Sequence, residues 1–534
     1  MIFIIAAVPV FAMADGQRLV PAGHWVYDSL WKISLELGEV NLANSAPLSR
    51  AEISLFLEAL NTAALSKAGL AEKERIEKYL GKTALSYQSF PFTIGIDPSI
   101  HLETYYKPSG DIPWLYGFNE KKHLVDLPVL VSLDNYISIE SNFFLANNYW
   151  TTLENDNFVN IPIGPMDTDI HFPDYAYFSF GIPIGGVFSL SGQLGKGSVL
   201  IGRTELGSII FDKNFYHDSY ATLSLHSPGF NLTAYTVQME VNRYLYLHKI
   251  DLNFKKIQIS VLEGSLINAP IELRFLNPLM AFHNYAPWRS YGDYSDDHNG
   301  PNKVRVASYF AANIDYNPWK YFRIYAMTAF NQMQIPFEKK HFGIAAASLP
   351  DSYSIQAGAE FAFPLDEAYL HGGFEGVFTR PWMYIDVEKD CSFYSKRLDL
   401  IKNTSQEIRT WLGFPFGPDA IAATAYLGYE KGGDWGAKCS YSVLVQGEMS
   451  GDKGFEVLEE PGFYPDEPEK AHWNTPHGTA QYTHTFILKG FYAPLDYLEL
   501  SSQLAYSYII NYDNKKNKTA SGVELTLSAT IKLP

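Results

Sequence analysis

The sequence predicts an all-β transmembrane barrel of about 18 antiparallel strands with a small three-helix bundle at its N-terminus. Three observations support this fold class. Aromatic residues make up 15% of the 534 residues, yet the mean hydropathy is only −0.11. Apolar and polar residues alternate over long stretches after residue 90. Beyond the N-terminal run, no uncharged apolar stretch is long enough for a transmembrane helix, which needs about 20 residues.

The alternating stretches have the length and composition of barrel strands. In the stretch 498–511, Leu500, Leu504 and Tyr506 alternate with polar residues such as Gln503 and Ser507. Such repeats are about 10 residues long, the length of a tilted transmembrane strand, and many carry Tyr or Phe near their ends. We count about 17 to 19 strands, from which an even number near 18 is expected.

The connections between these stretches are of two kinds. Short segments built around a proline, at 317–321, 363–367 and 493–497, predict tight turns. Polar stretches at 289–303, 389–406 and 451–478 predict long loops. Short periplasmic turns and long extracellular loops are typical of outer-membrane barrels.

The N-terminus predicts export and a helical segment. Residues 1–14 form a short apolar run that ends in Ala-Met-Ala, which is typical of a signal peptide, although an ordinary buried segment is an alternative. Residues 15–88 are predicted to form a periplasmic helical bundle, and residues 89–534 the barrel. Within the bundle we expect helices from Trp25 to Gly38, from a capping box at Ser49 and Glu52, and over 71–80.

Composition and motifs exclude several classes of function. The net charge of −17 argues against nucleic-acid binding, which requires an excess of Lys and Arg. We find no serine-hydrolase elbow and no zinc motif, so we expect no enzyme, no cofactor and no resident metal. Residues 295–299 have hard oxygen ligands suited to calcium, but a solvated loop is the simpler interpretation. The sequence leaves open whether Cys391 and Cys439 form a disulfide.

Part of the helical segment resembles a single surface-layer homology motif. The resemblance rests on residues 21–25 and 48–53, where His24 and Trp25 precede a Leu-Ser-Arg-Ala-Glu-Ile run. It implies contact with a cell-wall polymer. The alternative is a self-contained bundle that packs on the periplasmic mouth of the barrel.

Several segments, in their order along the chain, resemble the Wzi family of capsule-assembly outer-membrane proteins. These are residues 195–203 with Gly202-Arg203, 242–249, 261–264, 273–279, 374–384 and 413–420. The resemblance implies an 18-stranded barrel with an occluded lumen and a small periplasmic bundle. It also implies a non-catalytic role, in which the protein binds exported surface polysaccharide and organises it at the cell surface.

The loops contain groups that suit sugars, because aromatic rings can stack on sugar CH faces and polar groups can bind hydroxyls. The glycan-binding candidates are Trp288, Arg289, Tyr291, Asp293, Tyr294, Tyr464 and Trp473. At any single position, an interfacial girdle residue or ordinary loop packing is the alternative.

Two functions from different classes therefore follow from the sequence. The first is a surface-polysaccharide assembly barrel in the outer membrane, which we expect to be a monomer surrounded by outer-membrane lipid. The second is an outer-membrane diffusion porin tethered to the cell wall through its helical segment, since a barrel of this size is wide enough for a channel. A barrel protease or lipase has no motif to support it.

Overall fold

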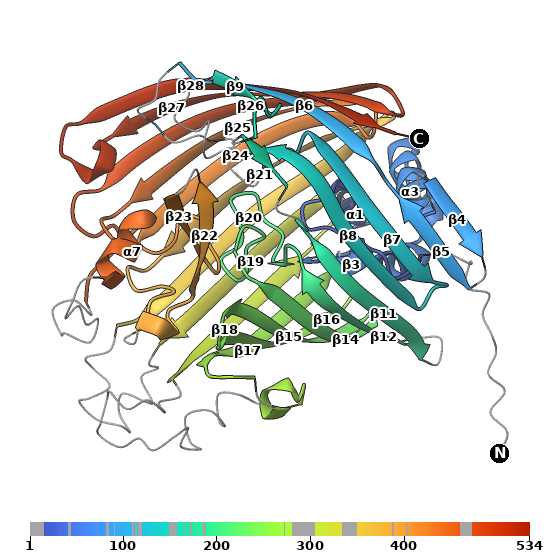
Figure 1. Cartoon of the computed structure of the whole chain (residues 1–534), viewed down its shortest axis with the longest axis horizontal. Helices are drawn as coiled ribbons and strands as arrows, with labels where there is room; N and C mark the ends of the chain where they lie inside the picture. Colours follow the sequence, from blue (N-terminus) through green and yellow to red (C-terminus); the bar gives the residue numbers. More distant parts are fainter. Residues whose placement is uncertain are drawn as a thin grey trace.

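In the described part of the chain, eighteen antiparallel strands form a closed barrel (Figure 1). This computed structural model describes residues 15–533 except 41–43, 82–84, 90, 109–111, 113–114, 116–119, 149–156, 166, 171–172, 185–187, 272, 280–304, 334–349, 387–388, 402–403 and 460–471. The barrel strands, in order around the wall, are β6 (Ser99–Tyr106), β7 (Val125–Leu133), β8 (Ile137–Asn147), β11 (Ala176–Ile184), β12 (Phe188–Lys196), β14 (Ser219–Ser227), β15 (Phe230–Glu240), β16 (Arg243–Asn253), β17 (Ile257–Asn268), β18 (Arg305–Tyr316), β19 (Phe322–Gln332), β20 (Ser352–Leu365), β21 (Ala368–Thr379), β24 (Ala420–Lys431), β25 (Trp435–Gln446), β26 (Gln481–Leu495), β27 (Leu498–Ile510) and β28 (Thr519–Lys532).

The barrel closes through its last strand. β28 pairs antiparallel with β6, from Lys532 opposite Ser99 to Leu525 opposite Tyr106. The predicted strand number is therefore confirmed, and the closed ring removes the edges that an open sheet would expose.

The alternation in the sequence places apolar side chains outside and polar side chains inside. On β27, Leu500, Leu504 and Tyr506 are more than 40% exposed, whereas Gln503 and Ser507 are at most 4% exposed. The same pattern holds on other strands, because Phe374 points outward and its neighbour Glu375 is buried in the lumen. The outer face is therefore suited to lipid and the inner face to polar contacts.

The short proline-containing segments mark turns at one end of the barrel, but Pro364 and Pro494 are the second-last residues of β20 and β26 and precede the turns. β20 and β21 are joined by residues 366–367, β26 and β27 by 496–497, and β18 and β19 by 317–321. Asp366 and Tyr321 adopt positive φ angles of 57° and 70° in these turns. We call this the short-turn end. The opposite, long-loop end carries the β22 (Tyr394–Ile401) and β23 (Thr404–Trp411) hairpin and helix α7 (Asp452–Glu459) (Figure 1).

The N-terminal helices form as the capping signals predict. α1 (Trp25–Leu37) ends at Gly38 with φ 70°, and α2 (Arg50–Glu58) begins with the complete Ser49–Glu52 capping box. α3 (Lys67–Leu80) begins four residues earlier than expected, because the Ser66 side chain accepts the Gly69 N–H and so caps the helix there. The three helices share an apolar core of Val26, Leu30, Ile33, Ile53, Phe56, Leu57, Ile76 and Leu80.

Short elements connect these parts. β1 (Leu19–Val20) pairs with β3 (Leu48–Ser49), and β2 (Ser45–Ala46) pairs with β13 (Leu200–Ile201). β4 (Leu85–Ser89) and β5 (Phe92–Ile96) form a hairpin. β9 (Asn157–Val159) pairs with β6, and β10 (Thr168–Asp169) pairs with β8. The 3-10 turns are η1 (Thr62–Ala64), η3 (Leu273–Leu276), η5 (Lys389–Cys391) and η6 (Tyr512–Asn514).

The helical bundle sits in the mouth of the barrel at the short-turn end (Figure 1). The Tyr321 N–H donates to the Leu35 carbonyl at 2.5 Å, and the Val40 N–H donates to the Lys255 carbonyl at 2.8 Å. None of the described helices is long and apolar enough to span a membrane. No disulfide joins Cys391 and Cys439, which settles the question left open by the sequence.

Candidate functional site

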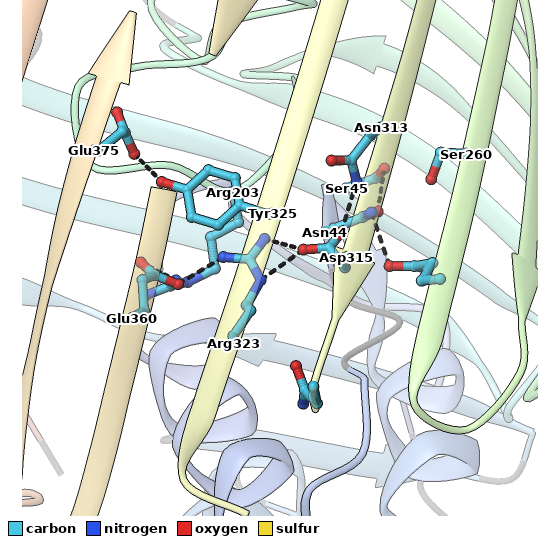
Figure 2. Close-up of polar contacts among 12 residues, drawn as sticks. Asn44, Ser45, Arg203, Ser260, Asn313, Asp315, Arg323, Tyr325, Glu360 and Glu375 are labelled. Carbon is cyan, nitrogen blue, oxygen red and sulfur yellow. Dashed lines mark hydrogen bonds and ion pairs between the residues drawn. The ribbon is translucent and has the colours of Figure 1, made fainter. Parts of the chain in front are cut away.

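The inner wall carries charged side chains on three neighbouring strands. Asp315 on β18, Arg323 on β19 and Glu360 on β20 are each less than a tenth exposed. The Arg323 guanidinium donates to Asp315 (Nε to Oδ1, 2.6 Å) and to Glu360 (Nη1 to Oε2, 2.6 Å) (Figure 2). One guanidinium balances only one of two carboxylates, so this group has room for a second cation.

Arg203 supplies that second cation from a different part of the chain. It lies in residues 197–218, the segment between β12 and β14 that folds into the barrel and that we call the luminal loop. Its Nη1 lies 3.3 Å from the Glu360 carboxylate, and its Nη2 donates to Asp28 of α1 at 2.9 Å. The guanidinium also lies 4.2 Å from the centre of the Trp31 ring. Arg203 therefore joins the luminal loop, the barrel wall and the helical bundle.

A second carboxylate holds the next residues of the luminal loop. Glu375 on β21 accepts the backbone N–H groups of Glu205 (2.8 Å) and Leu206 (2.9 Å). It also accepts from the Gln356 side chain (2.8 Å). The Tyr325 hydroxyl is its fourth donor (Figure 2). With four donors aimed at one carboxylate, the loop is fixed against the wall rather than lying loosely in the lumen.

The junction of helices, luminal loop and wall is closely packed. One cavity, against Trp31, Arg203 and Asn317, has a volume of about 10 Å³, and another of about 10 Å³ lies against Gly202 and Asn313. A cavity of this size holds about one water molecule. Gly202 has a φ of +95°, and a Cβ there would lie 2.8 Å from the Met327 sulfur, so only glycine fits.

The ion pair at the junction is maintained across neutral pH. Burial disfavours the charged form of Arg203, but the Glu360 and Asp28 carboxylates outweigh it and hold the Arg203 pKa above its ordinary value. Desolvation beside the barrel wall would raise the pKa of Asp28, but the Arg203 and Lys32 charges more than offset it and hold that pKa below its ordinary value. Both groups are therefore charged near pH 7.

Long loops fill the lumen from the other end. The Tyr384 hydroxyl donates to the Ile209 carbonyl (2.7 Å) and accepts from the Phe414 N–H (2.9 Å). Tyr309 of the wall donates to the Ile210 carbonyl (2.7 Å). A single apolar cluster includes Ile209, Ile210, Phe211, Trp382, Met383, Tyr384, Trp411, Leu412, Phe414 and Phe455. The described parts of the loops 380–419 and 447–480, with α7 in the second of them, thus pack together and on the luminal loop.

An aromatic stack lies beside this cluster at the long-loop end. The Trp473 ring is half-buried and stacks on His477 (3.7 Å between ring centres) and on the fully buried Trp382 (5.4 Å). Arg380 Nη1 donates to the Asn474 side chain at 3.0 Å. These contacts fix Trp473 in place and leave part of its ring exposed.

Replacing His217 with glutamine should remove part of the acid sensitivity of the fold. His217 in the luminal loop is 6% exposed, and burial lowers its pKa to about 4. The unfolded state therefore binds a proton at His217 at a higher pH than the folded state does. As a result, the free energy of unfolding is unaffected by this group above about pH 6.5 and decreases as the pH falls toward 4, by about 2 kcal/mol at pH 5. Urea unfolding at pH 7.5 and 5.0 measures this difference. Equal losses in wild type and His217→Gln would contradict it.

Comparison with known proteins supports the fold. No protein-family model and no curated protein matches the chain. Among solved structures it is similar to Wzi, an outer-membrane protein of Escherichia coli involved in group 1 capsule assembly and described as a carbohydrate-binding β-barrel. The TM-score is 0.59 at 11% identity, over 96% of this chain and 99% of Wzi. The chain has the fold of an outer-membrane β-barrel.

Two channel structures were also matched, at lower similarity. The DcaP channel of Acinetobacter baumannii gives a TM-score of 0.36 at 10% identity, over 84% of this chain and 99% of DcaP. OprD of Pseudomonas aeruginosa gives 0.40 at 7% identity, over 83% of this chain and 96% of OprD. Scores this low support no conclusion about this barrel.

Most of the sequence-predicted glycan residues lie outside the described residues. These are Trp288, Arg289, Tyr291, Asp293, Tyr294 and Tyr464, together with the calcium alternative at 295–299. Trp473 is described, and it is brought next to Trp382 and His477. In the segment that resembles a surface-layer motif, His24 and Trp25 pack against Tyr79 within the bundle. No comparison supports wall binding by that segment.

The charged junction was not among the features predicted from the sequence. The charged residues of the wall all occupy inward positions of their strands: Asp315, Arg323, Glu360 and Glu375. Charged residues at the lumen-facing positions of the alternation could therefore have been identified from the sequence. The pairing of Glu360 with Arg203, 157 residues away, had no local signal. Gly202-Arg203 was singled out only through the family resemblance.

Proposed function

We propose that this protein is a plugged outer-membrane barrel that binds exported surface polysaccharide and organises it at the cell surface without catalysis. The observation that carries the proposal is the filled lumen. The helical bundle enters from the short-turn end, and the apolar cluster of the loops 380–419 and 447–480, which we call the loop cluster, enters from the other end. Both contact the luminal loop. A barrel filled in this way has its loop face as the main surface left for a ligand. The likeness to Wzi, which is described as carbohydrate-binding, agrees with that role.

The proposed orientation follows from the two ends of the barrel. Residues 1–14 would direct export as a signal peptide, residues 15–88 would face the periplasm, and the barrel of residues 89–534 would place its long loops outside. The apolar outer wall would contact outer-membrane lipid, and the protein would act as a monomer. In this arrangement the aromatic residues of the long loops face the surface polymer.

Single-channel recording of the full chain in a planar bilayer tests the filled lumen. We expect the inserted wild-type barrel to give no steady conductance. Insertion is checked separately by protease protection of the strands. A steady open conductance would overturn the proposal and would favour the alternative diffusion porin. Sedimentation of the whole protein with peptidoglycan would test whether that porin is also tethered.

Removing loop aromatics should weaken glycan binding. We expect the variant Trp288→Ala/Tyr291→Ala/Tyr294→Ala to retain at least about tenfold less surface polysaccharide, since each stacked aromatic contributes about 0.5–1.5 kcal/mol. The measurement is pull-down of labelled surface polysaccharide from the same cells.

The matched control for this variant removes three outward-facing tyrosines of the wall, Tyr441, Tyr506 and Tyr508, each of which is 40–48% exposed. This control should retain the polymer at the wild-type level. Absence of binding by the wild-type protein would contradict the proposed function. Equal binding by the loop variant would contradict the assignment of these residues.

A further inference from the structure

A groove of about 700 Å³ crosses the outer wall of the barrel from Gly436 at the start of β25 over β26, β27, β28 and β6 and ends at β9. Its middle is lined by small residues, among them Gly490, Ser502 and Ala529. Large apolar side chains border it, and they are partly exposed on the outer face: Leu102, Val159, Ile161, Tyr492, Leu500 and Leu527.

Strand register explains why the wall is hollow here. Gly490 lies opposite Ser502, which in turn lies opposite Leu527 on β28. In the next row, Tyr492 lies opposite Leu500, and Leu500 opposite Ala529. Small residues on adjacent strands therefore occur side by side, and no outward side chain fills the space between the larger residues around them.

The groove lies beside the point where β6 separates from β7. β5 and the start of β6 pair with β7, the last two pairs being Ser99 with Asp126 and Ile100 with Val125. Farther along, β6 pairs with β9 instead. The Asn160 side chain, fully buried, donates to the His101 and Lys122 carbonyls and accepts the Glu103 N–H, which bridges the separated strands.

We propose that this groove binds an acyl chain of a bilayer lipid. The large exposed side chains around it are apolar on β26, β27, β28 and β6, as expected for a wall embedded in hydrocarbon, and the exposed polar side chains that line it are the short ones of Thr104 and Ser502. Water fills an apolar hollow poorly because it finds few hydrogen-bond partners there. A flexible hydrocarbon chain can follow the space between rows of side chains and recover the dispersion contacts that an empty groove would lose.

The size of the groove favours a lipid chain over a second copy of the protein. Sixteen residues line it, whereas a standard protein interface uses about 20–30 residues on each side. A single chain could occupy the groove without contacts elsewhere on the wall. The site does not depend on the filled lumen or on polysaccharide binding, because the apolar side chains that border it lie on the outer face of the wall, whereas the junction lies inside the barrel.

Filling the groove with side chains tests the site. The variant Gly490→Leu/Ser502→Leu places two apolar side chains in the groove. A Cβ at position 490 would have its nearest neighbours at 3.5 and 3.9 Å, so the backbone accepts it without a clash. Gly376→Leu on β21 is the matched control, because it faces outward elsewhere on the wall and a Cβ there would lie 3.9 Å from the Ala422 carbonyl.

The probe is a phosphatidylethanolamine with a photoreactive diazirine on its acyl chain, used in nanodiscs that hold the full-length protein. We expect peptides of β27 and β28 to be labelled several-fold more than peptides of β20 and β21. This excess should be lost in Gly490→Leu/Ser502→Leu and kept in Gly376→Leu. Native mass spectrometry should show one retained phospholipid per barrel in wild type and in Gly376→Leu, and its loss in Gly490→Leu/Ser502→Leu.

Even labelling around the barrel would overturn the proposal, as would equal labelling of the filled variant. If the groove instead holds a second copy, wild type would run as a dimer, the filled variant as a monomer, and neither would show preferential lipid labelling. The folded state of each variant is checked by its heat-modifiable electrophoretic mobility, so loss of folding is distinguished from loss of binding.

Discussion

Replacing Arg203 with methionine should lower the free energy of unfolding by about 3 kcal/mol. Removing one partner of a buried ion pair leaves its carboxylates without compensation, which typically costs about 3–5 kcal/mol. The lower figure is expected here because Glu360 keeps Arg323 as a partner and Asp28 is partly exposed. Urea unfolding, followed by the shift in electrophoretic mobility between folded and unfolded barrel, measures the change.

Arg409→Met provides the control for Arg203→Met. Arg409 pairs with Glu407, two residues away on β23, and is about one fifth exposed, so its removal should change stability by less than about 1 kcal/mol. The double variant Arg203→Met/Asp28→Asn should lose less than the sum of the two single variants, because the two residues share one interaction. Strict additivity would contradict the contact between the luminal loop and α1.

The same substitution links stability to the state of the lumen. Arg203 is bonded to both the bundle and the wall, so its loss should loosen the plug as well as destabilise the barrel. We therefore expect brief openings in planar-bilayer recordings of Arg203→Met that wild type and Arg409→Met do not show. A silent Arg203→Met barrel with reduced stability would assign Arg203 a purely structural role.

The barrel could be predicted because its signal is local. Each strand repeats with period two, and each flip of parity, such as that across Pro364 between Ile355 and Phe374, locates a turn without any knowledge of distant residues. Helix caps are local in the same way, as the Ser49 capping box illustrates. The start of α3 was misplaced because its first turn, residues 67–70, contains a glycine and only one large apolar residue, so the Ser66 cap alone defines it.

The junction could not be predicted, because its partners meet only in the folded barrel. Asp28, Arg203 and Glu360 come from a helix, a loop and a strand separated by more than 150 residues at each step. Parity indicates that Glu360 faces the lumen, but not which cation reaches it. The aromatic content of the loops identified candidate residues for ligand binding. It did not show which rings are buried within the fold, as Trp382 is, and which stay accessible to a ligand.

Replacing Trp382 with alanine should have the largest effect of any change in the loop cluster. The ring is fully buried and stacks on Trp473, and truncation of a buried Trp typically costs about 3–5 kcal/mol through lost contacts and the cavity left behind. Limited proteolysis should therefore cut the 380–419 and 447–480 loops faster, while the barrel strands stay folded. Trp435→Ala is the control, since that ring is 39% exposed on the outer wall.

This substitution also separates a structural from a binding role of the loop cluster. If the cluster holds Trp473 in place for a glycan, Trp382→Ala should weaken polysaccharide retention together with loop order, because Trp473 loses one of the rings it stacks on. Trp473→Ala should then weaken retention with a smaller effect on proteolysis, since Trp473 is already half-exposed. Loosened loops with full retention would exclude Trp473 from the binding surface and restrict the glycan contacts to the other loop residues.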